Sequence, residues 1–317
     1  MTTIGIDLGG TKVAVALFDE NGNILFKNKS DVFAAKGKEV GRIIASALGE
    51  VMEESKTMGL SPGGIGISVP GIAHRSGDVW APNISGWEKY PIKKEIESEI
   101  RNICGVYVES DRACHLMGEV WKGAARGCSN AIFLAVGTGI GAGIMTEGQI
   151  LTGSNGISGS IGWMALRPPY DPTNYKERGC FESYASGHGI TERACALLRD
   201  GTSSVLKSRK VRLTAEDVFD AFAEHDPLAV KVIDDAIQFW GMAAANLVSL
   251  FNPEKIIFGG GVFGPAAKLI DQIYKEALQW AQPISMKQVK FEASQLGGNA
   301  GLIGAGYLAG RAKVLNC

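Results

Sequence analysis

Two stretches of this chain share one arrangement of strands and turns. Residues 3–25 read TIGIDLGGTKVAVALFDENGNIL, and residues 131–151 read AIFLAVGTGIGAGIMTEGQIL. In each stretch an apolar run reaches a turn of glycine and threonine, a second apolar run follows, and a short turn leads into a third strand. Such a repeat predicts two related lobes, each beginning with a three-stranded meander.

The composition is typical of a globular protein that binds a small molecule. The chain has 317 residues, of which 45% are hydrophobic and 21% are charged. At roughly 150 residues per domain, this length predicts about two domains with a ligand cleft between them. Lys and Arg (32) nearly balance Asp and Glu (33), giving a net charge of -1. We therefore expect a small-molecule partner and neither nucleic acid nor a membrane surface.

The cysteines and the amino terminus indicate a reduced, soluble protein. Six cysteines occur without a C-x-x-C pair, which favours free thiols over a disulfide framework. The first residues lack the basic and apolar regions of a signal peptide, and no apolar window is suited to spanning a bilayer. The sequence predicts a cytoplasmic location.

Beyond the meanders, apolar spacing predicts alternating helices and strands. We expect helices over 38–58, 215–223, 228–250, 266–280 and 301–311, and strands over 65–69, 106–109 and 255–258. This alternation favours an α/β protein with largely parallel sheets. The predicted lobes are residues 1–122 and 123–300, and a C-terminal helix over about 301–317 returns to the first lobe.

Glycine is unusually frequent, with 42 residues against the usual ~7% of a protein. It is concentrated at positions 9–10, 137–143, 259–261 and 297–306. Because glycine lets backbone N–H groups approach a ligand closely, these clusters predict a phosphate-binding site built from distant parts of the chain. Neither a Walker A loop nor a dinucleotide-binding fingerprint is present.

The order of these motifs resembles the actin, hexokinase and Hsp70 ATPase superfamily, and within it the ROK family. The resemblance covers nearly the whole chain and is carried by Asp7-Leu-Gly-Gly-Thr-Lys12, Val69-Pro-Gly71, Pro82-Asn-Ile-Ser-Gly-Trp87, Glu109-Ser-Asp-Arg-Ala113, Val136-Gly-Thr-Gly-Ile-Gly-Ala-Gly143, Gly179-Cys-Phe-Glu182 and Phe258-Gly-Gly-Gly261. It implies an α/β fold of two ribonuclease-H-like (actin-like ATPase) lobes with a cleft between them, closing on ATP. It also implies a homodimer or homotetramer.

The resemblance implies a kinase that transfers the ATP γ-phosphoryl group to a hydroxyl of a hexose or hexose derivative. Asp111 matches the catalytic aspartate, and Asp7 would hold Mg²⁺ through water. The other matched positions would bind nucleotide or phosphate (Gly9, Gly10, Thr11, Lys12, Gly137, Thr138, Gly139, Gly260 and Gly261) or the sugar (Gly71, Asn83, Ser110, Ser160, Trp163 and Glu182).

Asp111 is also suited to catalysis by its place between a strand and a helix. We expect the helix to start near Ala113, where the helix dipole favours a charged carboxylate. Such a group can orient a hydroxyl and accept its proton during phosphoryl transfer. The alternative is that Asp111 only caps the helix.

The chain departs from the family pattern at the residues that bind structural zinc in relatives. Where the family has a sugar-contacting Glu and a zinc-binding His, this chain has Ser160 and Trp163. Three further cysteine positions are Thr173, Tyr175 and Cys180. One cysteine cannot form a tetrahedral zinc site, so we predict no zinc. We also expect Pro168, Pro169, Tyr170 and Tyr175 to hold this loop by packing.

Several residues keep two interpretations at this stage. Trp163 either stacks on a sugar or fills the space of the missing metal. Trp80 and Trp87 either line the sugar pocket or belong to the core. His188 is a minor ligand candidate near Glu182. Cys114 and His115 are adjacent on a helix, so their side chains do not converge, and we interpret both as structural.

Two other functions compete with the kinase. One is a non-catalytic, sugar-sensing regulator, although DNA binding is not expected because no winged-helix domain precedes Asp7 in this sequence. The other is ATP hydrolysis coupled to conformational work, which would leave Asn83, Asp111 and Glu182 without a sugar to bind.

Overall fold

The computed structural model describes residues 1–208 and 212–311, so Cys317 and the end of the predicted helix over 301–317 lie outside the described residues. The chain forms two compact units. The first unit contains Met1–Gly127, Leu151–Ser158 and the chain from Gln295 onward, and the second contains Cys128–Ile150 and Gly159–Ser294. Each unit has its own five-stranded sheet, which confirms the predicted α/β class with two lobes.

The sheet of the first unit has the strand order β3-β2-β1-β4-β7. Its strands are β1 (Thr3–Leu8), β2 (Lys12–Phe18), β3 (Ile24–Asp31), β4 (Gly64–Val69) and β7 (Gly105–Ser110). The first three form the predicted antiparallel meander, and β4 and β7 run parallel to β1. A separate two-stranded sheet joins β5 (Ile72–Ala73) to β6 (Val79–Trp80).

The sheet of the second unit repeats this topology, with the order β10-β9-β8-β11-β12. Its strands are β8 (Ala131–Val136), β9 (Ile140–Thr146), β10 (Gln149–Ile150), β11 (Lys255–Gly259) and β12 (Lys290–Ala293). β8, β9 and β10 are antiparallel neighbours, and β11 and β12 run parallel to β8. The internal repeat seen in the sequence is therefore a repeat of strand order and direction.

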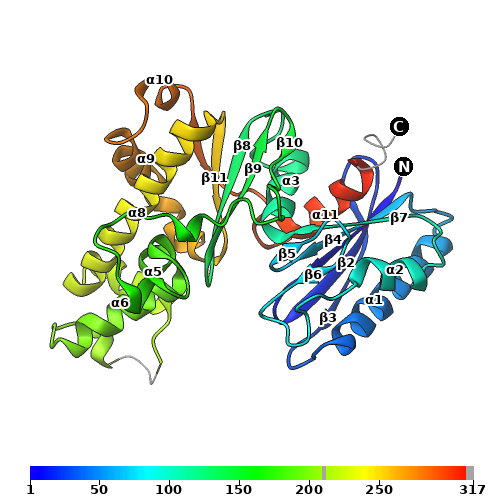
Figure 1. The fold of residues 1–317 in the computed structure, drawn as a ribbon, viewed down its shortest axis with the longest axis horizontal. Coiled ribbons are helices and arrows are strands. Elements are labelled where there is room, and N and C mark those ends of the chain that lie inside the picture. The colour runs from blue at the N-terminus through cyan, green and yellow to red at the C-terminus, as the bar shows by residue number, and fades with distance from the viewer. Residues whose placement is uncertain (209–211, 312–317) are drawn as a thin grey trace. The chain divides into compact units, whose positions relative to one another are not determined.

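Helices cover both faces of the first sheet (Figure 1). They are α1 (Lys38–Thr57), α2 (Ile92–Glu99), α3 (Asp111–Lys122) and α11 (Ala300–Arg311), the last preceded by the 3-10 turn η5 (Gly297–Asn299). Ile4 and Ile6 belong to the apolar cluster that includes α1, whereas Gly5 faces α11. The alternation of side chains along β1 thus supplies a core on each face.

The glycines of α11 serve helix packing, contrary to their predicted part in phosphate binding. A methyl group added at Gly304 would lie 1.7 Å from the carbonyl oxygen of Cys114 on α3. One added at Gly66 on β4 would lie 1.9 Å from the carbonyl oxygen of Ala305. Only glycine allows α11 to lie this close to both α3 and the sheet.

The second unit contains more helices than the sequence predicts. The α-helices are α4 (Pro172–Tyr175), α5 (Cys180–Ala185), α6 (Gly187–Arg199), α7 (Ala215–Ala223), α8 (Pro227–Phe251), α9 (Ile270–Leu278) and α10 (Pro283–Met286), and the 3-10 helices are η1 (Ile161–Trp163), η2 (Val205–Ser208), η3 (Gly261–Phe263) and η4 (Pro265–Leu269). The predicted helix over 266–280 is divided between η4 and α9.

The long helix α8 forms the centre of the second unit's core. Asp226 caps it by accepting hydrogen bonds from the N–H groups of Leu228 and Ala229, and Asn252 ends it in the left-handed conformation. Trp240 on this helix is fully buried and donates from Nε1 to the carbonyl oxygen of Ala185 at 3.1 Å. Despite its apolar character, neither α8 nor any other described helix meets the length and hydropathy needed to cross a membrane.

Candidate functional site

Each sheet carries an exposed turn of glycine and threonine between its first two strands. In the first unit the turn lies between β1 and β2, and the N–H of Gly9 donates to the carbonyl oxygen of Lys12 at 2.8 Å. In the second unit the turn lies between β8 and β9, and the N–H of Gly137 donates to the carbonyl oxygen of Gly139 at 2.9 Å. The predicted phosphate-binding residues Gly10, Thr11 and Thr138 are exposed in these turns. The two turns therefore occupy equivalent positions in the repeated topology.

Asp7 places its carboxylate against the first turn of α11. The residue lies on β1, where it pairs with Ala14 and Ser68. A methyl group added at Gly301 would lie 2.7 Å from Oδ1 of Asp7, so glycine is required at that helix position. The N-terminal end of a helix attracts negatively charged groups, and Asp7 is placed against this end of α11.

Asp111 is the first residue of α3, directly after β7. The helix begins two residues before Ala113, and the alternative interpretation that Asp111 only caps the helix is wrong. Ser110 is the cap, because its Oγ accepts a hydrogen bond from the N–H of Ala113 at 3.4 Å. Oδ1 of Asp111 instead accepts from the N–H of Arg112 at 2.8 Å. Since Ser110 caps the helix, the carboxylate of Asp111 is not needed for that purpose.

The surroundings of Asp111 make its carboxyl group a better proton acceptor than an exposed aspartate. Burial raises the pKa of Asp111, and the neighbouring Asp7 raises it further, whereas His115, Arg112 and the N–H of Arg112 act in the opposite direction. Asp7 and Asp111 are thus close enough to interact electrostatically. A raised pKa increases the affinity of a carboxylate for the proton of a hydroxyl group.

Gly71 is linked to the Asp111 region through Arg112. Nη2 of Arg112 donates to the carbonyl oxygen of Gly71 at 3.4 Å. Gly71 has φ +109°, and a methyl group there would lie 2.2 Å from the carbonyl oxygen of Trp80. Asn83 is exposed in the turn after β6. One predicted sugar residue, Gly71, is therefore bonded to the residue that follows Asp111.

The two tryptophans beside Asn83 have different environments. Trp87 is fully buried, stacks on Tyr90 with ring centroids 4.3 Å apart, and donates from Nε1 to the carbonyl oxygen of Gly37 at 3.0 Å. Trp87 is therefore a core residue, and the pocket-wall interpretation is wrong for it. Trp80 is 39% exposed.

His115 and Cys114 also differ. The ring Nδ1 of His115 lies 2.5 Å from the carbonyl oxygen of Asp111, and the histidine interacts electrostatically with the Asp111 carboxyl group. His115 thus acts on the candidate catalytic residue, which sequence reasoning missed. Burial raises the pKa of Cys114 well above its ordinary value, so this thiol stays protonated and unreactive.

Glu182 connects the two predicted binding segments of the second unit. Its Oε2 accepts a hydrogen bond from the N–H of Ile140 at 2.7 Å, directly after the glycine turn. Methyl groups added at Gly139 and Gly162 would lie 2.8 and 2.9 Å from the same oxygen. Burial raises the pKa of Glu182, while the N–H of Ile140 and the charge of Arg178 lower it. The carboxylate thus lies between the glycine turn and the segment that carries Ser160 and Trp163.

A cavity of about 1140 Å³ lies within the second unit and includes three predicted nucleotide residues, Gly137, Thr138 and Gly261. The N-terminal end of α6 forms another part of its wall, with Gly187 donating to the carbonyl oxygen of Gly137 at 2.8 Å. Helix N-termini favour anionic groups such as phosphates. His188 lines this cavity together with residues that sequence reasoning missed: Thr191, Glu192, Cys195, Leu198, Leu206, Lys207, Arg212, Leu213, Thr214, Ala215 and Val262.

A family model described as "ROK family" matches residues 3–312. The chain belongs to the ROK family. It is 34% identical over 315 residues to a glucokinase of Halalkalibacterium halodurans, covering 96% of this chain and 94% of that protein. It is also 26% identical to a xylose repressor of Caldicellulosiruptor bescii, covering 95% of this chain and 76% of the repressor. The predicted family is thereby confirmed.

Solved ROK structures have the same fold. A ROK hexokinase from Thermus thermophilus superposes with a TM-score of 0.82 at 28% identity, covering 100% of both chains. A ROK family glucokinase from Streptomyces griseus, solved in complex with glucose and AMPPNP, gives a TM-score of 0.77 at 28% identity over 98% of this chain and 100% of that one.

The positions of the family's zinc ligands have other surroundings in this ROK protein. Cys180 and Tyr175 are buried, whereas Trp163 is 57% exposed and Tyr170 is 69% exposed. Trp163 therefore does not fill a buried metal space. Tyr170 packs edge-on against Tyr175, with ring centroids 6.1 Å apart, although most of its side chain is exposed. Within residues 1–208 and 212–311, no three His, Cys, Asp or Glu side chains are grouped closely enough to hold a metal ion.

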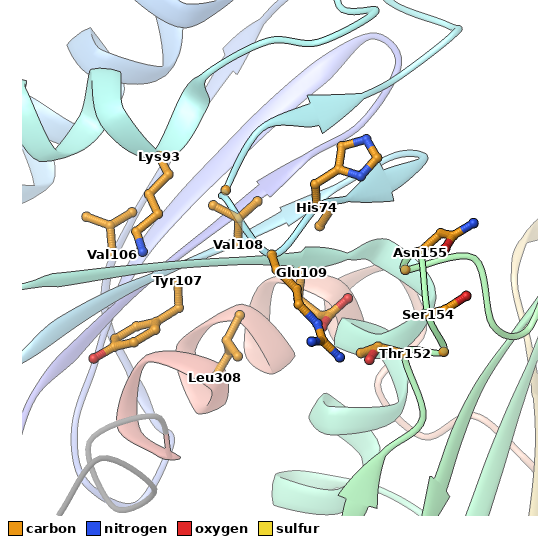
Figure 2. A pocket seen from close by; sticks show the side chains of 15 residues that line it. His74, Lys93, Val106, Tyr107, Val108, Glu109, Thr152, Ser154, Asn155 and Leu308 are labelled. Atoms are coloured by element: carbon orange, nitrogen blue, oxygen red, sulfur yellow. The ribbon is translucent and has the colours of Figure 1, made fainter.

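A smaller cavity of about 380 Å³ lies in the first unit along the edge strand β7. Figure 2 shows Lys93 at the Val106 end of this strand and Ser154 and Asn155 toward the Glu109 end. None of the predicted site residues lines it. The cavity is therefore distinct from the residues proposed for catalysis.

Proposed function

We propose that this ROK protein is an ATP-dependent sugar kinase that transfers the γ-phosphoryl group to a hydroxyl of a hexose or hexose derivative. The observation that carries the proposal is the carboxyl group of Asp111, which burial makes more basic and which lies beside Asp7. The similarity to a glucokinase, which covers 96% of this chain, supports the proposal.

Asp111 is the proposed general base. Its carboxylate accepts a hydrogen bond from the attacking sugar hydroxyl and takes the proton as the oxygen attacks the γ-phosphorus. The bond between the γ-phosphorus and the bridging oxygen breaks, and ADP leaves with the bond electrons. His115 and Arg112 lie on the helix side of Asp111, and their charges limit the rise of its pKa.

The nucleotide is proposed to bind the two glycine turns and the cavity of the second unit. Gly9, Gly10, Thr11 and Lys12 would bind phosphate from one unit, and Gly137, Thr138 and Gly139 from the other. The adenosine end would lie near Gly260 and Gly261, in the cavity that already includes Gly261. The bound AMPPNP of the Streptomyces griseus relative supports ATP as the phosphoryl donor.

Asp7 fits the demands of a magnesium site. Mg²⁺ keeps several waters and takes one or two carboxylates together with phosphate oxygens, so a dedicated cluster of ligands is not required. Asp7 would hold the ion through water, with the Asp111 carboxyl close enough to interact with it electrostatically. When bound, Mg²⁺ neutralises charge on the phosphates.

The sugar is proposed to bind Gly71, Asn83, Ser110 and Asp111 from the first unit and Ser160, Trp163 and Glu182 from the second. Since Ser160 and Trp163 stand where the family has Glu and His, glucose specificity is not carried over from the relatives. We also propose that the kinase acts in the cytoplasm as a homodimer or homotetramer, following the tendency of the family.

A coupled ADP-release assay across hexoses, N-acetylhexosamines, pentoses and polyols tests the proposal. We expect sugar-dependent ADP release, and a loss of about 10²–10⁴-fold in kcat in Asp111→Asn. Asp271→Asn is the matched control, because Asp271 is an exposed aspartate in the first turn of α9. Unchanged turnover in Asp111→Asn would exclude it as the base. Sugar binding without ADP release would favour the regulator, for which the similarity to a xylose repressor is the supporting observation.

A further inference from the structure

An aromatic cavity of about 390 Å³ lies in the second unit, separate from the proposed nucleotide cavity. Its walls are formed by Trp163, Ala165, Arg167, Pro168, Tyr170, Tyr175, Gly179 and Cys180. Arg167 supplies the only charged side chain of this set, and its guanidinium lies 5.4 Å above the ring of Tyr184. The cavity is therefore lined mainly by aromatic rings and small apolar groups.

The floor of this cavity is buried and its rim is exposed. Tyr175 and Cys180 are 6% and 5% exposed, and Tyr175 packs against Tyr184 with ring centroids 6.3 Å apart. Trp163 and Tyr170 on the rim are both more than half exposed. Large aromatic side chains left open around a preformed hollow are typical of ligand sites.

The cavity adjoins the carboxylate that we propose binds the sugar. A methyl group at Gly162 would lie 2.9 Å from Oε2 of Glu182, and Trp163 is the next residue along the chain. On the other side, a methyl group at Gly179 would lie 2.5 Å from Cα of Trp163. Gly162 and Gly179 thus bring the backbone of Trp163 close to Glu182. Trp163 thus connects the segment beside Glu182 to the aromatic walls.

We propose that this cavity is a subsite for an aryl group carried by the acceptor sugar, so that the preferred substrates are aryl glycosides of a hexose. This inference rests on the proposed kinase function and narrows its substrate class. The transferred phosphoryl group and the base are unchanged. The aryl group takes no part in the chemical step and contributes binding alone.

The chemistry of the walls favours an aryl group over other occupants. An apolar cavity of roughly 150 Å³ is enough to hold benzene, so this one has room for a phenyl ring. A second sugar ring would bring several hydroxyl groups to walls whose only charged side chain is Arg167, and buried hydroxyls without partners are costly. An aryl ring can instead form stacked or edge-to-face contacts with Trp163 and Tyr170.

The test compares phenyl and methyl glycosides of the same hexose and anomer by isothermal titration calorimetry without nucleotide. The panel covers the gluco, galacto, manno and 2-acetamido sugars. We expect at least one phenyl glycoside to bind about tenfold more tightly than its methyl partner, because the phenyl ring buries apolar surface. If no phenyl glycoside binds more tightly than its methyl partner, the subsite is refuted.

Single substitutions test whether the preference for phenyl glycosides arises in this cavity. Trp163→Ala and Tyr170→Ala should each bring the phenyl-to-methyl affinity ratio close to one. Trp280→Ala is the matched control, because Trp280 is 62% exposed in the same unit and does not line the cavity. A ratio that persists in both cavity variants would overturn the assignment.

The ADP-release assay separates this inference from the proposed function. If phenyl glycosides bind more tightly but no sugar causes ADP release, the aryl subsite is supported and the proposed kinase function is refuted. If methyl glycosides or free sugars cause ADP release but phenyl glycosides show no lower Kd, the kinase function is supported and the aryl subsite is refuted.

Discussion

Glu119 joins separate backbone segments of the first unit. The substitution Glu119→Gln should lower the free energy of unfolding of the protein by about 3 kcal/mol. The side chain is fully buried. Oε2 accepts from the N–H of Ala124 at 2.7 Å, and Oε1 accepts from the N–H groups of Gln295 and Leu296 at 3.1 and 3.2 Å. These bonds tie the end of α3 to the segment that leads into α11.

The magnitude follows from the chemistry of the acceptor. A hydrogen bond to a charged group contributes about 1.5–3 kcal/mol. Glutamine retains a single acceptor oxygen and turns its NH₂ group toward at least one of the N–H donors. At least one of these backbone hydrogen bonds is then lost, and its buried N–H group faces the NH₂ group of the glutamine. Glu119→Ala leaves all three donors without this acceptor, and should cost about 5 kcal/mol.

Urea unfolding followed by circular dichroism measures the effect, and thermal unfolding should show a Tm lower by roughly 10 °C for the glutamine variant. Glu254→Gln is the matched control. Oε1 of Glu254 also accepts two backbone hydrogen bonds, from Ser129 at 2.8 Å and Asn130 at 2.9 Å, but the residue is exposed. Water can replace those bonds, so the control should lose less than about 1 kcal/mol. Equal losses in the two variants would refute the reasoning from burial.

Four further predictions concern Asp111 and the glycines. Because burial raises the pKa of Asp111, kcat/KM should fall as pH drops through that raised pKa, and a pH–rate profile of Asp111→Asn should lack this limb. The same raised pKa means that the ionised Asp111 carboxylate destabilises the folded protein. Asp111→Asn should therefore have a higher urea midpoint than the wild type at neutral pH. Below the ordinary pKa of aspartate the two midpoints should be equal, because the wild-type carboxyl is then protonated as well. Gly304→Ala should destabilise the protein by about 3 kcal/mol or more, because the new methyl group meets the carbonyl oxygen of Cys114, whereas Gly298→Ala, with open space around it, should change the urea midpoint little. Gly261→Val should leave the melting temperature near that of the wild type but raise the KM for ATP roughly tenfold. Apart from its neighbours in the chain, no described residue has an atom within 4 Å of a methyl group added at Gly261, and the residue lines the proposed nucleotide cavity.

The sequence predicted the two meanders and the long helices because their signals are local. Alternating apolar runs around glycine turns specify β1, β2, β8 and β9, and the predicted helix over 228–250 differs from α8 by one residue at each end. The start of α3 was misplaced because two capping residues are adjacent in the sequence. Only the hydrogen bond from Ala113 to Ser110 shows which one is the cap.

The candidate site was predicted less completely because burial and distance depend on tertiary packing. Trp87 and Trp163 are the same residue type, yet one is fully buried and the other is 57% exposed. The nucleotide cavity joins Thr138 to Leu206 and Leu213, and no sequence pattern relates residues so far apart. His115 affects Asp111 through its position one helical turn later, and helical spacing was the available signal.

The two sheets share a topology, but the aspartates of the first sheet have no counterparts at the same places of the second. Asp7 lies two residues before the glycine turn of the first sheet, and Ala135 holds that place in the second. Asp111 follows Ser110 at the end of β7, and Gln295 follows Ser294 beyond β12. Additional carboxylates would repel the phosphates that the two turns are proposed to bind. The absence of aspartate at these two places of the second sheet is therefore consistent with phosphate binding at both turns and with Asp111 as the single proposed base.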